Sequence, residues 1–243
     1  MSKIYVVGIG PGSMEDMTPR ARKAMEASDI IIGYGAYIEL IKEYFPGKSL
    51  VSSGMTREVE RCGLVLEKAL EGKTVALISS GDSGIYGMAG IMLEVVNKSG
   101  RDVPVEVIPG ITAANGAAAL LGAPIMHDFA VISLSDLLTP WELIRKRLEC
   151  AAAGDFVLCL YNPKSRQRSE YIGIARDILL KSRDGKTPVG IVRNVGRQDE
   201  SYVITTLEDM LQCEIDMFTV VLVGNSKTYV ENGRMITPRG YTI

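Results

Sequence analysis

The chain of 243 residues carries a net charge of −2 and consists of 47% hydrophobic and 23% charged residues. This length fits one or two compact domains, and the nearly balanced charge provides no broad basic surface for nucleic acid. Four scattered cysteines and one histidine, His127, predict neither a disulfide framework nor a zinc site. Without a signal-like segment or a long apolar run, we expect a cytoplasmic protein that has no nucleic-acid, membrane or metal partner.

The first half alternates short β-branched runs with amphipathic segments, a pattern typical of βα units around a parallel sheet. We predict strands at residues 3–9, 29–34, 74–79 and 104–108. Thr18 followed by Pro19 predicts the start of a helix. A second helix is predicted within residues 56–72, with Gly72 at its end. Its predicted core face comprises Val59, Cys62, Val65, Leu66, Ala69 and Leu70.

The second half begins where an alanine-rich run ends at Gly122-Ala123-Pro124. We therefore predict two α/β domains, residues 1–122 and 123–243. Thr139 and Glu142 have the spacing of a capping box at the start of a helix. Later apolar runs follow one another closely, and Asn232-Gly233 predicts a hairpin turn. The second sheet is therefore expected to be mixed, and the first mainly parallel.

The opening loop, VGIGPG at residues 7–12, is similar to a dinucleotide-binding motif. That motif needs a third glycine where this chain has Ser13, and a helix that begins at once. Here the predicted helix starts only near Pro19, and Glu15 and Asp16 would repel a phosphate. The loop is therefore expected to border a different ligand.

Two further glycine-rich breaks, SSGDSGIYG at 79–87 and PGITAANG at 109–116, follow predicted strands. Since ligands collect at the carboxyl ends of parallel strands, the three loops are expected to share a ligand site. Alternatively, the glycines only make tight turns and close packing possible. Asp82 either caps the following helix or accepts a hydrogen bond from a ligand. Thr112 and Ala113 offer backbone groups to a flat polar ring.

These loops, with YNPKSR at 161–166, resemble in order those of the tetrapyrrole methylases, S-adenosylmethionine-dependent enzymes that methylate corrin and sirohaem precursors. MHDFAVISLSDLLTPWE at 126–142 and GRMITPRGY at 233–241 resemble more narrowly the branch that acts at C-17 of precorrin-3B or cobalt-factor III. The resemblance implies two α/β domains with the cofactor and the tetrapyrrole bound between them. It further implies C-methylation with ring contraction in cobalamin biosynthesis, and a homodimer.

The resemblance also implies which residues contact the cofactor. They are Pro11, Gly81, Asp82, Ile85, Thr112, Ala113, Tyr161, Asn162 and Val195. Much of the wider family has proline after the Gly-Asp pair, where this chain has Ser83. The loop thus lacks one φ restraint, which leaves the position of Ile85 less fixed.

A tetrapyrrole carries many carboxylates, which an acidic protein must bind through local groups. The candidates are Ser133, Ser135, Asp136, Lys164, Arg166 and Arg168. The basic stretch is equally consistent with a solvated helix start, and the two serines and Asp136 with a turn. Since a sulfonium methyl is already activated, no catalytic residue is assigned. His127 and Asp136 are candidates for acid–base assistance to ring contraction, although a structural hydrogen bond is favoured for His127.

Two other functions are consistent with the sequence. One keeps the cofactor and changes the substrate, as in a related tetrapyrrole or diphthine-type methyltransferase. The other is a non-catalytic nucleotide-binding module. Whether the substrate contains cobalt is left open by the residues.

Overall fold

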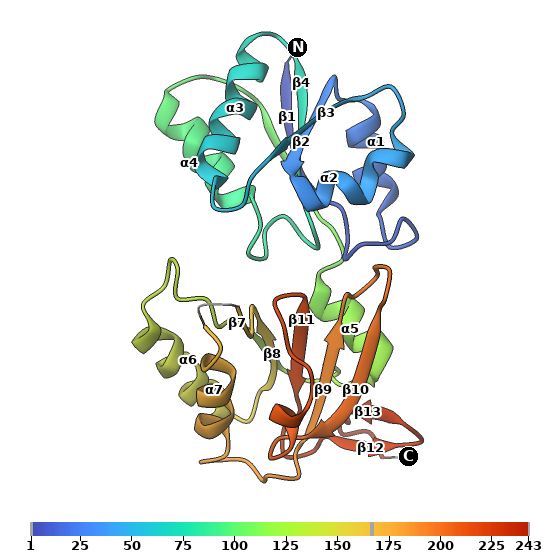
Figure 1. Ribbon diagram of the computed structural model, residues 1–243, viewed down its shortest axis with the longest axis vertical. Helices are drawn as coiled ribbons and strands as arrows, with labels where there is room; N and C mark the ends of the chain where they lie inside the picture. The colour runs from blue at the N-terminus through green and yellow to red at the C-terminus, as the bar shows by residue number, and fades with distance from the viewer. Residues whose placement is uncertain (1, 166–167, 243) are drawn as a thin grey trace. The chain divides into compact units, whose positions relative to one another are not determined.

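The computed structural model describes residues 2–165 and 168–242 (Figure 1). Contacts divide the chain into two units, Met1–Ala113 and Ala114–Ile243. This division falls before the boundary predicted at residues 122–123, and the alanine-rich helix is grouped with the second unit. Each unit has its own sheet and its own hydrophobic core.

The first unit is built on a five-stranded sheet in the order β3-β2-β4-β1-β5, and every strand pair is parallel, as predicted. Its strands are β1 (Lys3–Gly8), β2 (Ile30–Tyr34), β3 (Ser49–Ser53), β4 (Thr74–Ser79) and β5 (Val105–Ile108). The four predicted strands are all present. Strand β3 was not predicted, because it lies at the sheet edge and has no continuous apolar run.

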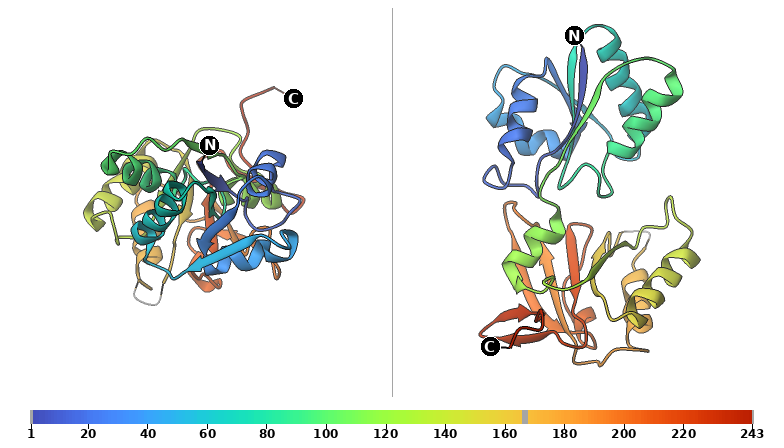
Figure 2. Two further views of the ribbon diagram at one scale, coloured as in Figure 1. Left: turned by 90° about the horizontal axis from the view of Figure 1, so that it is seen from above. Right: turned by 180° about the vertical axis from the view of Figure 1, so that it is seen from behind.

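Helices cover both faces of this sheet (Figure 2). On one face lie α1 (Pro19–Glu26) and α2 (Gly35–Ile41), followed by the 3₁₀ turn η1 (Lys42–Tyr44). On the other lie α3 (Glu58–Leu70) and α4 (Ala89–Ser99). Helix α1 begins as predicted, because the Thr18 hydroxyl accepts a hydrogen bond from Ala21 N–H at 3.1 Å.

The core face of α3 is narrower than predicted. Cys62, Val65 and Ala69 are buried, but Val59 and Leu70 are 68% and 52% exposed. At 3.6 residues per turn, Val59 and Leu70 fall at the edge of the buried stripe, one at each end of the helix. The prediction that they belong to the core was therefore wrong.

The second unit has a five-stranded sheet in the order β10-β9-β11-β8-β7. Its strands are β7 (Phe129–Ser133), β8 (Val157–Tyr161), β9 (Pro188–Arg193), β10 (Ser201–Thr206) and β11 (Thr219–Val223). Strands β7 and β8 pair in parallel and the other pairs are antiparallel, which confirms the mixed sheet.

Helices α6 (Trp141–Ala153) and α7 (Tyr171–Leu179) pack on one face of this sheet. Helix α5 (Ala113–Leu121) packs on the other, where Gly190 makes room for the Leu121 side chain. The 3₁₀ turn η2 (Met210–Gln212) precedes β11. No helix within residues 2–165 and 168–242 is both long and apolar enough to cross a membrane.

The predicted capping box at α6 is not formed. Pro140 is extended, with ψ of 135°, so the helix begins one residue later than a Thr139 cap requires. Glu142 instead contacts Arg145 at 3.3 Å. The hairpin turn at Asn232-Gly233 is confirmed, because both residues have positive φ and join two antiparallel strands, β12 (Tyr229–Glu231) and β13 (Arg234–Ile236). Strand β13 also pairs with β6 (Gly122–Ala123).

Candidate active site

Three loops of the first unit follow β4, β1 and β5, which are neighbours in the parallel sheet. The N–H of Gly10 donates to the carbonyl of Gly81 at 3.1 Å, and the N–H of Gly81 donates to the carbonyl of Gly10 at 2.7 Å. The loops after β1 and β4 are therefore joined by their backbones. They form the edge at which open α/β sheets bind ligands.

Two glycines at this edge let the loops approach more closely than other residues would. A Cβ on Gly110 would lie 2.2 Å from the carbonyl oxygen of Gly81. A Cβ on Gly8 would lie 2.7 Å from the backbone nitrogen of Gly110. At these two positions, therefore, the glycines are required for close packing of the loops.

Asp82 connects two of the loops through its carboxylate. One oxygen accepts a hydrogen bond from Gly84 N–H at 2.8 Å, and the other accepts from Gly110 N–H at 3.0 Å. Helix α4 has no side-chain cap, so the alternative that Asp82 caps the following helix is wrong. A carboxylate oxygen can accept more than one hydrogen bond, so the predicted contact with the cofactor is compatible with this arrangement.

Ser83 occupies the position where much of the wider family has proline. It is fully buried, and its hydroxyl lies 3.3 Å from the carbonyl oxygens of both Val6 and Ile108. The hydroxyl can donate its single hydrogen to either carbonyl. The serine thus binds the loop to β1 or to the end of β5, through a hydrogen bond that proline could not donate.

The other predicted cofactor residues of the first unit differ in exposure. Pro11 is buried, and its carbonyl accepts from the Ser80 hydroxyl at 3.5 Å. A Cβ on Gly81 would lie 3.7 Å from both Thr112 Cα and Ala113 N, so these three residues are adjacent. Ile85 is 38% exposed and provides apolar surface.

In the second unit, β8 and β9 are both antiparallel to β11, and β7 is parallel to β8. The carboxyl ends of β7, β8 and β9 therefore lie at one edge of the sheet, which brings together the predicted residues that follow them. The Asn162 amide donates to the Ser133 hydroxyl at 2.9 Å. The Tyr161 hydroxyl accepts from Ala114 N–H at 2.8 Å, at the start of α5. Val195 is buried.

Ser135, Asp136 and Arg168 form a second group at this edge, which we call the Asp136 cluster together with Tyr171 and Trp141. Arg168 donates to the Ser135 hydroxyl, and its Nη1 lies 3.7 Å from Asp136 Oδ1. The Tyr171 phenol donates to Asp136 Oδ2 at 2.6 Å. This hydrogen bond raises the pKa of Tyr171 above its ordinary value.

Trp141 and Tyr171 are the residues of this cluster that the sequence did not reveal. Their rings stack with centroids 3.9 Å apart at 15°. Each is the first residue of its helix, α6 or α7. An aromatic residue at the start of a helix is usually interpreted as part of the hydrophobic core. The sequence offered one indication of a role in the site, because both helices follow predicted site loops.

The basic residues predicted to bind substrate, Lys164, Arg166 and Arg168, do not share one environment. Lys164 is exposed and has no ion-pair partner within the described ranges, whereas Arg168 is bound into the Asp136 cluster. Arg166 lies outside the described residues. Its predicted contact with substrate therefore stays a prediction.

His127 lies before the amino end of β7, whereas Ser133 and Asp136 lie at its carboxyl end. Five strand residues separate the two ends by roughly 17 Å. The His127 ring instead accepts a hydrogen bond from Asp128 N–H at 2.8 Å. Within this unit, His127 and Asp136 thus do not share a site, and the hydrogen bond matches the structural role favoured for His127.

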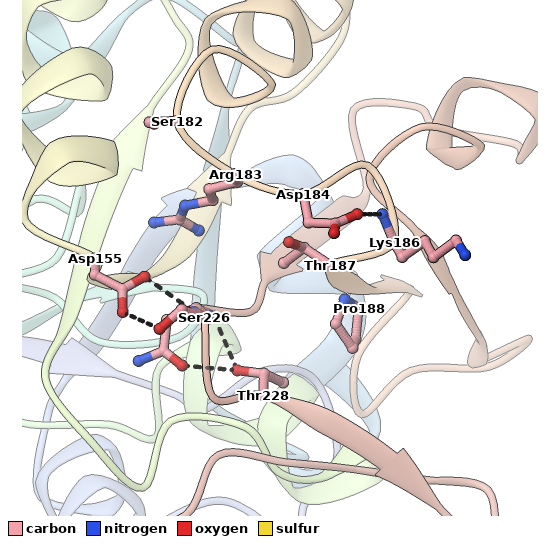
Figure 3. A pocket seen from close by; sticks show the side chains of 10 residues that line it. Asp155, Ser182, Arg183, Asp184, Lys186, Thr187, Pro188, Ser226 and Thr228 are labelled. Atoms are coloured by element: carbon pink, nitrogen blue, oxygen red, sulfur yellow. Dashed lines mark hydrogen bonds between the residues drawn. The ribbon is translucent and has the colours of Figure 1, made fainter.

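A polar cavity of about 290 Å³ opens at the opposite edge of the second sheet (Figure 3). Its lining residues lie just before β8, before or at the start of β9, or after β11, and thus at the opposite ends of β8 and β9 from Tyr161 and Val195. Asp155 accepts from both the N–H and the hydroxyl of Ser226, at 2.9 and 2.6 Å. Arg183 donates to the Gly224 carbonyl at 2.5 Å. These side chains hold loops together, and the cavity includes none of the predicted site residues.

Known proteins with similar sequences and structures define the family to which this chain belongs. Residues 3–211 match the family described as tetrapyrrole (corrin/porphyrin) methylases. A probable cobalt-factor III C(17)-methyltransferase of Salmonella typhimurium is 53% identical over 99% of this chain and 100% of its own length. Two other curated relatives are longer, and the chain spans 45% and 53% of their lengths.

Solved structures agree with this similarity. The crystal structure of the methyltransferase CobJ matches with a TM-score of 0.92 at 34% identity, covering 98% of this chain and 100% of that one. Uroporphyrin-III C-methyl transferase from Thermus thermophilus, complexed with S-adenosylhomocysteine, shares the fold with a TM-score of 0.69 at 23% identity, over 92% of each chain. The chain belongs to the tetrapyrrole methylases. It is a methyltransferase.

Proposed function

We propose that the protein transfers a methyl group from S-adenosylmethionine to C-17 of a precorrin-3B or cobalt-factor III type tetrapyrrole. The ring contracts in the same reaction, which belongs to cobalamin biosynthesis. The observation that carries this proposal is the 53% identity to the Salmonella typhimurium relative over that relative's entire length.

The joined loops of the first unit are the proposed binding edge for S-adenosylmethionine. The proposed contacts are Pro11, Gly81, Asp82, Ile85, Thr112 and Ala113. The loops present backbone groups next to the exposed apolar side chain of Ile85, a combination that suits a flat adenine ring with polar edges. The cofactor supplies a methyl group already activated on a sulfonium sulfur. The protein therefore has to bind and orient the two reactants and to exclude water, and it needs no nucleophilic side chain.

The second unit is proposed to contribute Tyr161, Asn162 and Val195 to cofactor binding. Because the Tyr161 hydroxyl is engaged at α5 and Val195 is buried, we propose that these two residues act through main-chain groups. The substrate is proposed to contact Ser133, Ser135, Asp136, Lys164, Arg166 and Arg168.

Asp136 is the proposed acid–base group for ring contraction. Its side chain is 35% exposed, so it can meet a ligand. A carboxylate in this position can take up or return a proton as the macrocycle rearranges.

We further propose that the protein is a homodimer, as the family resemblance implies, and that it is located in the cytoplasm. Light scattering on the purified protein gives its mass in solution. A mass of one chain would contradict the dimer without bearing on the chemistry.

The test is incubation with S-adenosylmethionine carrying a ¹³C-labelled methyl group, with precorrin-3B and cobalt-factor III in separate reactions. We expect mass spectrometry to detect one added methyl group, and carbon NMR to place the label at C-17 in one of the two products. Reactions with S-adenosylhomocysteine are the control. Label at another carbon, or no transfer to either ring, would contradict the proposal. Calorimetric binding of NAD or ATP in place of S-adenosylmethionine would favour a nucleotide-binding module.

A further inference from the structure

Tyr171 is packed against the core of the second unit and forms a hydrogen bond with Asp136, an acidic side chain of the proposed substrate site. Its ring stacks on Trp141, and both rings pack against the core of the second unit. The phenol donates to Asp136 Oδ2 at 2.6 Å. Asp136 lies in the loop between β7 and α6, so this hydrogen bond fixes an exposed carboxylate to a rigid support.

The distance between the charged atoms of Asp136 and Arg168 is longer than the N···O distance in an ion pair that is also hydrogen-bonded. Nη1 of Arg168 lies 3.7 Å from Asp136 Oδ1, whereas charge-assisted N–H···O bonds span about 2.7–2.9 Å. A carboxylate that could turn freely would close onto the guanidinium in a two-bond pair. Here the other oxygen is held by Tyr171, and the pair stays open.

Arg168 is held by neighbours other than Asp136. Its Nε donates to the Ser165 hydroxyl at 3.1 Å, and Nη1 donates to the Ser135 hydroxyl. Within the described part of the chain, Nη2 has no hydrogen-bond partner. The guanidinium is thus oriented by two hydroxyl groups.

We propose that Tyr171 is a positioning residue that holds the Asp136 carboxylate away from Arg168, so that Arg168 can bind a carboxylate of the tetrapyrrole. The ligand in this statement rests on the proposed function. The geometry itself does not depend on which ring carbon is methylated. Hydroxyl anchors on the guanidinium and a phenol anchor on the carboxylate together keep the ion pair from closing into a hydrogen-bonded, two-bond pair.

The first test is Tyr171→Phe, which keeps the ring stacked on Trp141 and removes only the hydroxyl. Asp136 then closes onto Arg168 and competes with the substrate. We expect the Kd and the KM of the tetrapyrrole to rise about tenfold, the loss of roughly one charge-assisted hydrogen bond, with a smaller change in kcat. The Kd of S-adenosylmethionine should stay unchanged. Trp141 is the only tryptophan in the sequence, so quenching of its fluorescence by the tetrapyrrole measures the Kd.

The second variant combines Tyr171→Phe with Asp136→Asn. The Asp136→Asn single variant is the reference for this double variant. A neutral amide attracts the guanidinium less strongly than a carboxylate does, so removing the Tyr171 hydroxyl in this background should change the Kd by less than about threefold. A role for Tyr171 in the fold alone predicts the same rise in Kd in both backgrounds. Tyr202→Phe is the matched control, since it removes the same hydroxyl from a residue of β10 that is 52% exposed.

Each outcome decides between the alternatives. An unchanged Kd in Tyr171→Phe, or an equally large rise in Kd when Tyr171→Phe is added to Asp136→Asn, would overturn the role of Tyr171 and leave the proposed function standing. The expected Kd pattern with methylation at a carbon other than C-17 would overturn the proposed function alone. Failure of the wild type to bind precorrin-3B or cobalt-factor III would overturn both.

Discussion

At the scale of single residues, the candidate site contains side chains that hold the protein together as well as side chains suited to a ligand. Asp82 is the clearest example, because both of its carboxylate oxygens accept backbone hydrogen bonds from the loops it joins. The sequence indicated that an isolated acid at a strand end accepts hydrogen bonds. It did not indicate that the donors belong to the protein, because Gly110 is 28 positions away along the chain.

Asp82→Ala is expected to lower both stability and cofactor affinity. Removing the carboxylate leaves the N–H groups of Gly84 and Gly110 unpaired, at a cost of about 1–3 kcal/mol in unfolding free energy. For a chain of this size, the midpoint of thermal unfolding should fall by about 2–4 °C per kcal/mol. The affinity for S-adenosylmethionine, measured by calorimetry, should also fall.

The matched variant is Asp82→Asn. Its amide oxygen can still accept one of the two backbone hydrogen bonds, so its melting temperature should lie between those of the wild type and Asp82→Ala. Weaker cofactor binding in Asp82→Ala at an unchanged melting temperature would contradict the structural part of this role. Unchanged affinity in both variants would remove Asp82 from the cofactor site.

Asp216 provides a pH-dependent contribution to stability. Burial raises its pKa, but hydrogen bonds from Phe218 N–H, the Thr219 hydroxyl and the Arg193 guanidinium outweigh this effect and leave the pKa below its ordinary value. A lowered folded-state pKa stabilises the protein above the unfolded-state pKa of about 3.9, and this stabilisation is lost as pH falls through the folded-state value. Asp216→Asn should therefore be less stable at pH 7 and lose less stability in acid.

Urea unfolding at a series of pH values between about 7 and 3 measures this difference. The two unfolding free energies should converge as the pH falls. Curves that stay parallel over the whole range would show that Asp216 does not titrate differently in the folded and unfolded states.

At the scale of elements, the strand-end loops of the first unit depend on backbone contacts that a side chain would prevent. Strands followed by glycine-rich breaks were predictable, because both the apolar runs and the breaks are local features. Strand β3 and the exposed ends of α3 were not, because the depth at which an edge element is buried depends on its neighbours. The capping box at α6 was also predicted wrongly. Pro140 adopts an extended conformation, so the helix begins at Trp141, and the local sequence does not show this.

Gly110→Ala should push the loops after β4 and β5 apart. The added methyl group would lie 2.2 Å from a backbone oxygen, a contact that only movement of the loops can relieve. We expect a lower melting temperature and at least a tenfold loss of affinity for S-adenosylmethionine, roughly 1.4 kcal/mol. Calorimetry and thermal unfolding measure the two effects.

Gly63→Ala is the control for this change. Gly63 lies within α3, and an added Cβ meets no atom within 4 Å. Alanine should stabilise the helix by about 0.5–1 kcal/mol and leave the affinity unchanged. Equal affinities for Gly110→Ala and the wild type would show that the cofactor does not depend on this close approach.

At the scale of the whole molecule, the sequence predicted two kinds of sheet, and the structure has them. Local apolar runs and turns distinguish a parallel from a mixed sheet, so the sequence could predict the two kinds of sheet. It could predict only part of the Asp136 cluster. Asp136 and Arg168 stood out by charge, but the hydrogen bond from Tyr171 joins residues 35 positions apart, and no local pattern indicates it.

The arrangement of strands also sets the order in which the two sheets can be completed during synthesis. The first sheet has its fifth strand once the ribosome has passed Ile108. The second sheet needs β11 between β8 and β9, and that strand ends only at Val223. Until then β8 and β9 lack the strand that joins them, so their apolar faces and unpaired backbone groups stay open on the nascent chain. The first sheet thus has all its strands early, whereas the sheet that carries the Asp136 cluster depends on β11, which is made much later than Ile108.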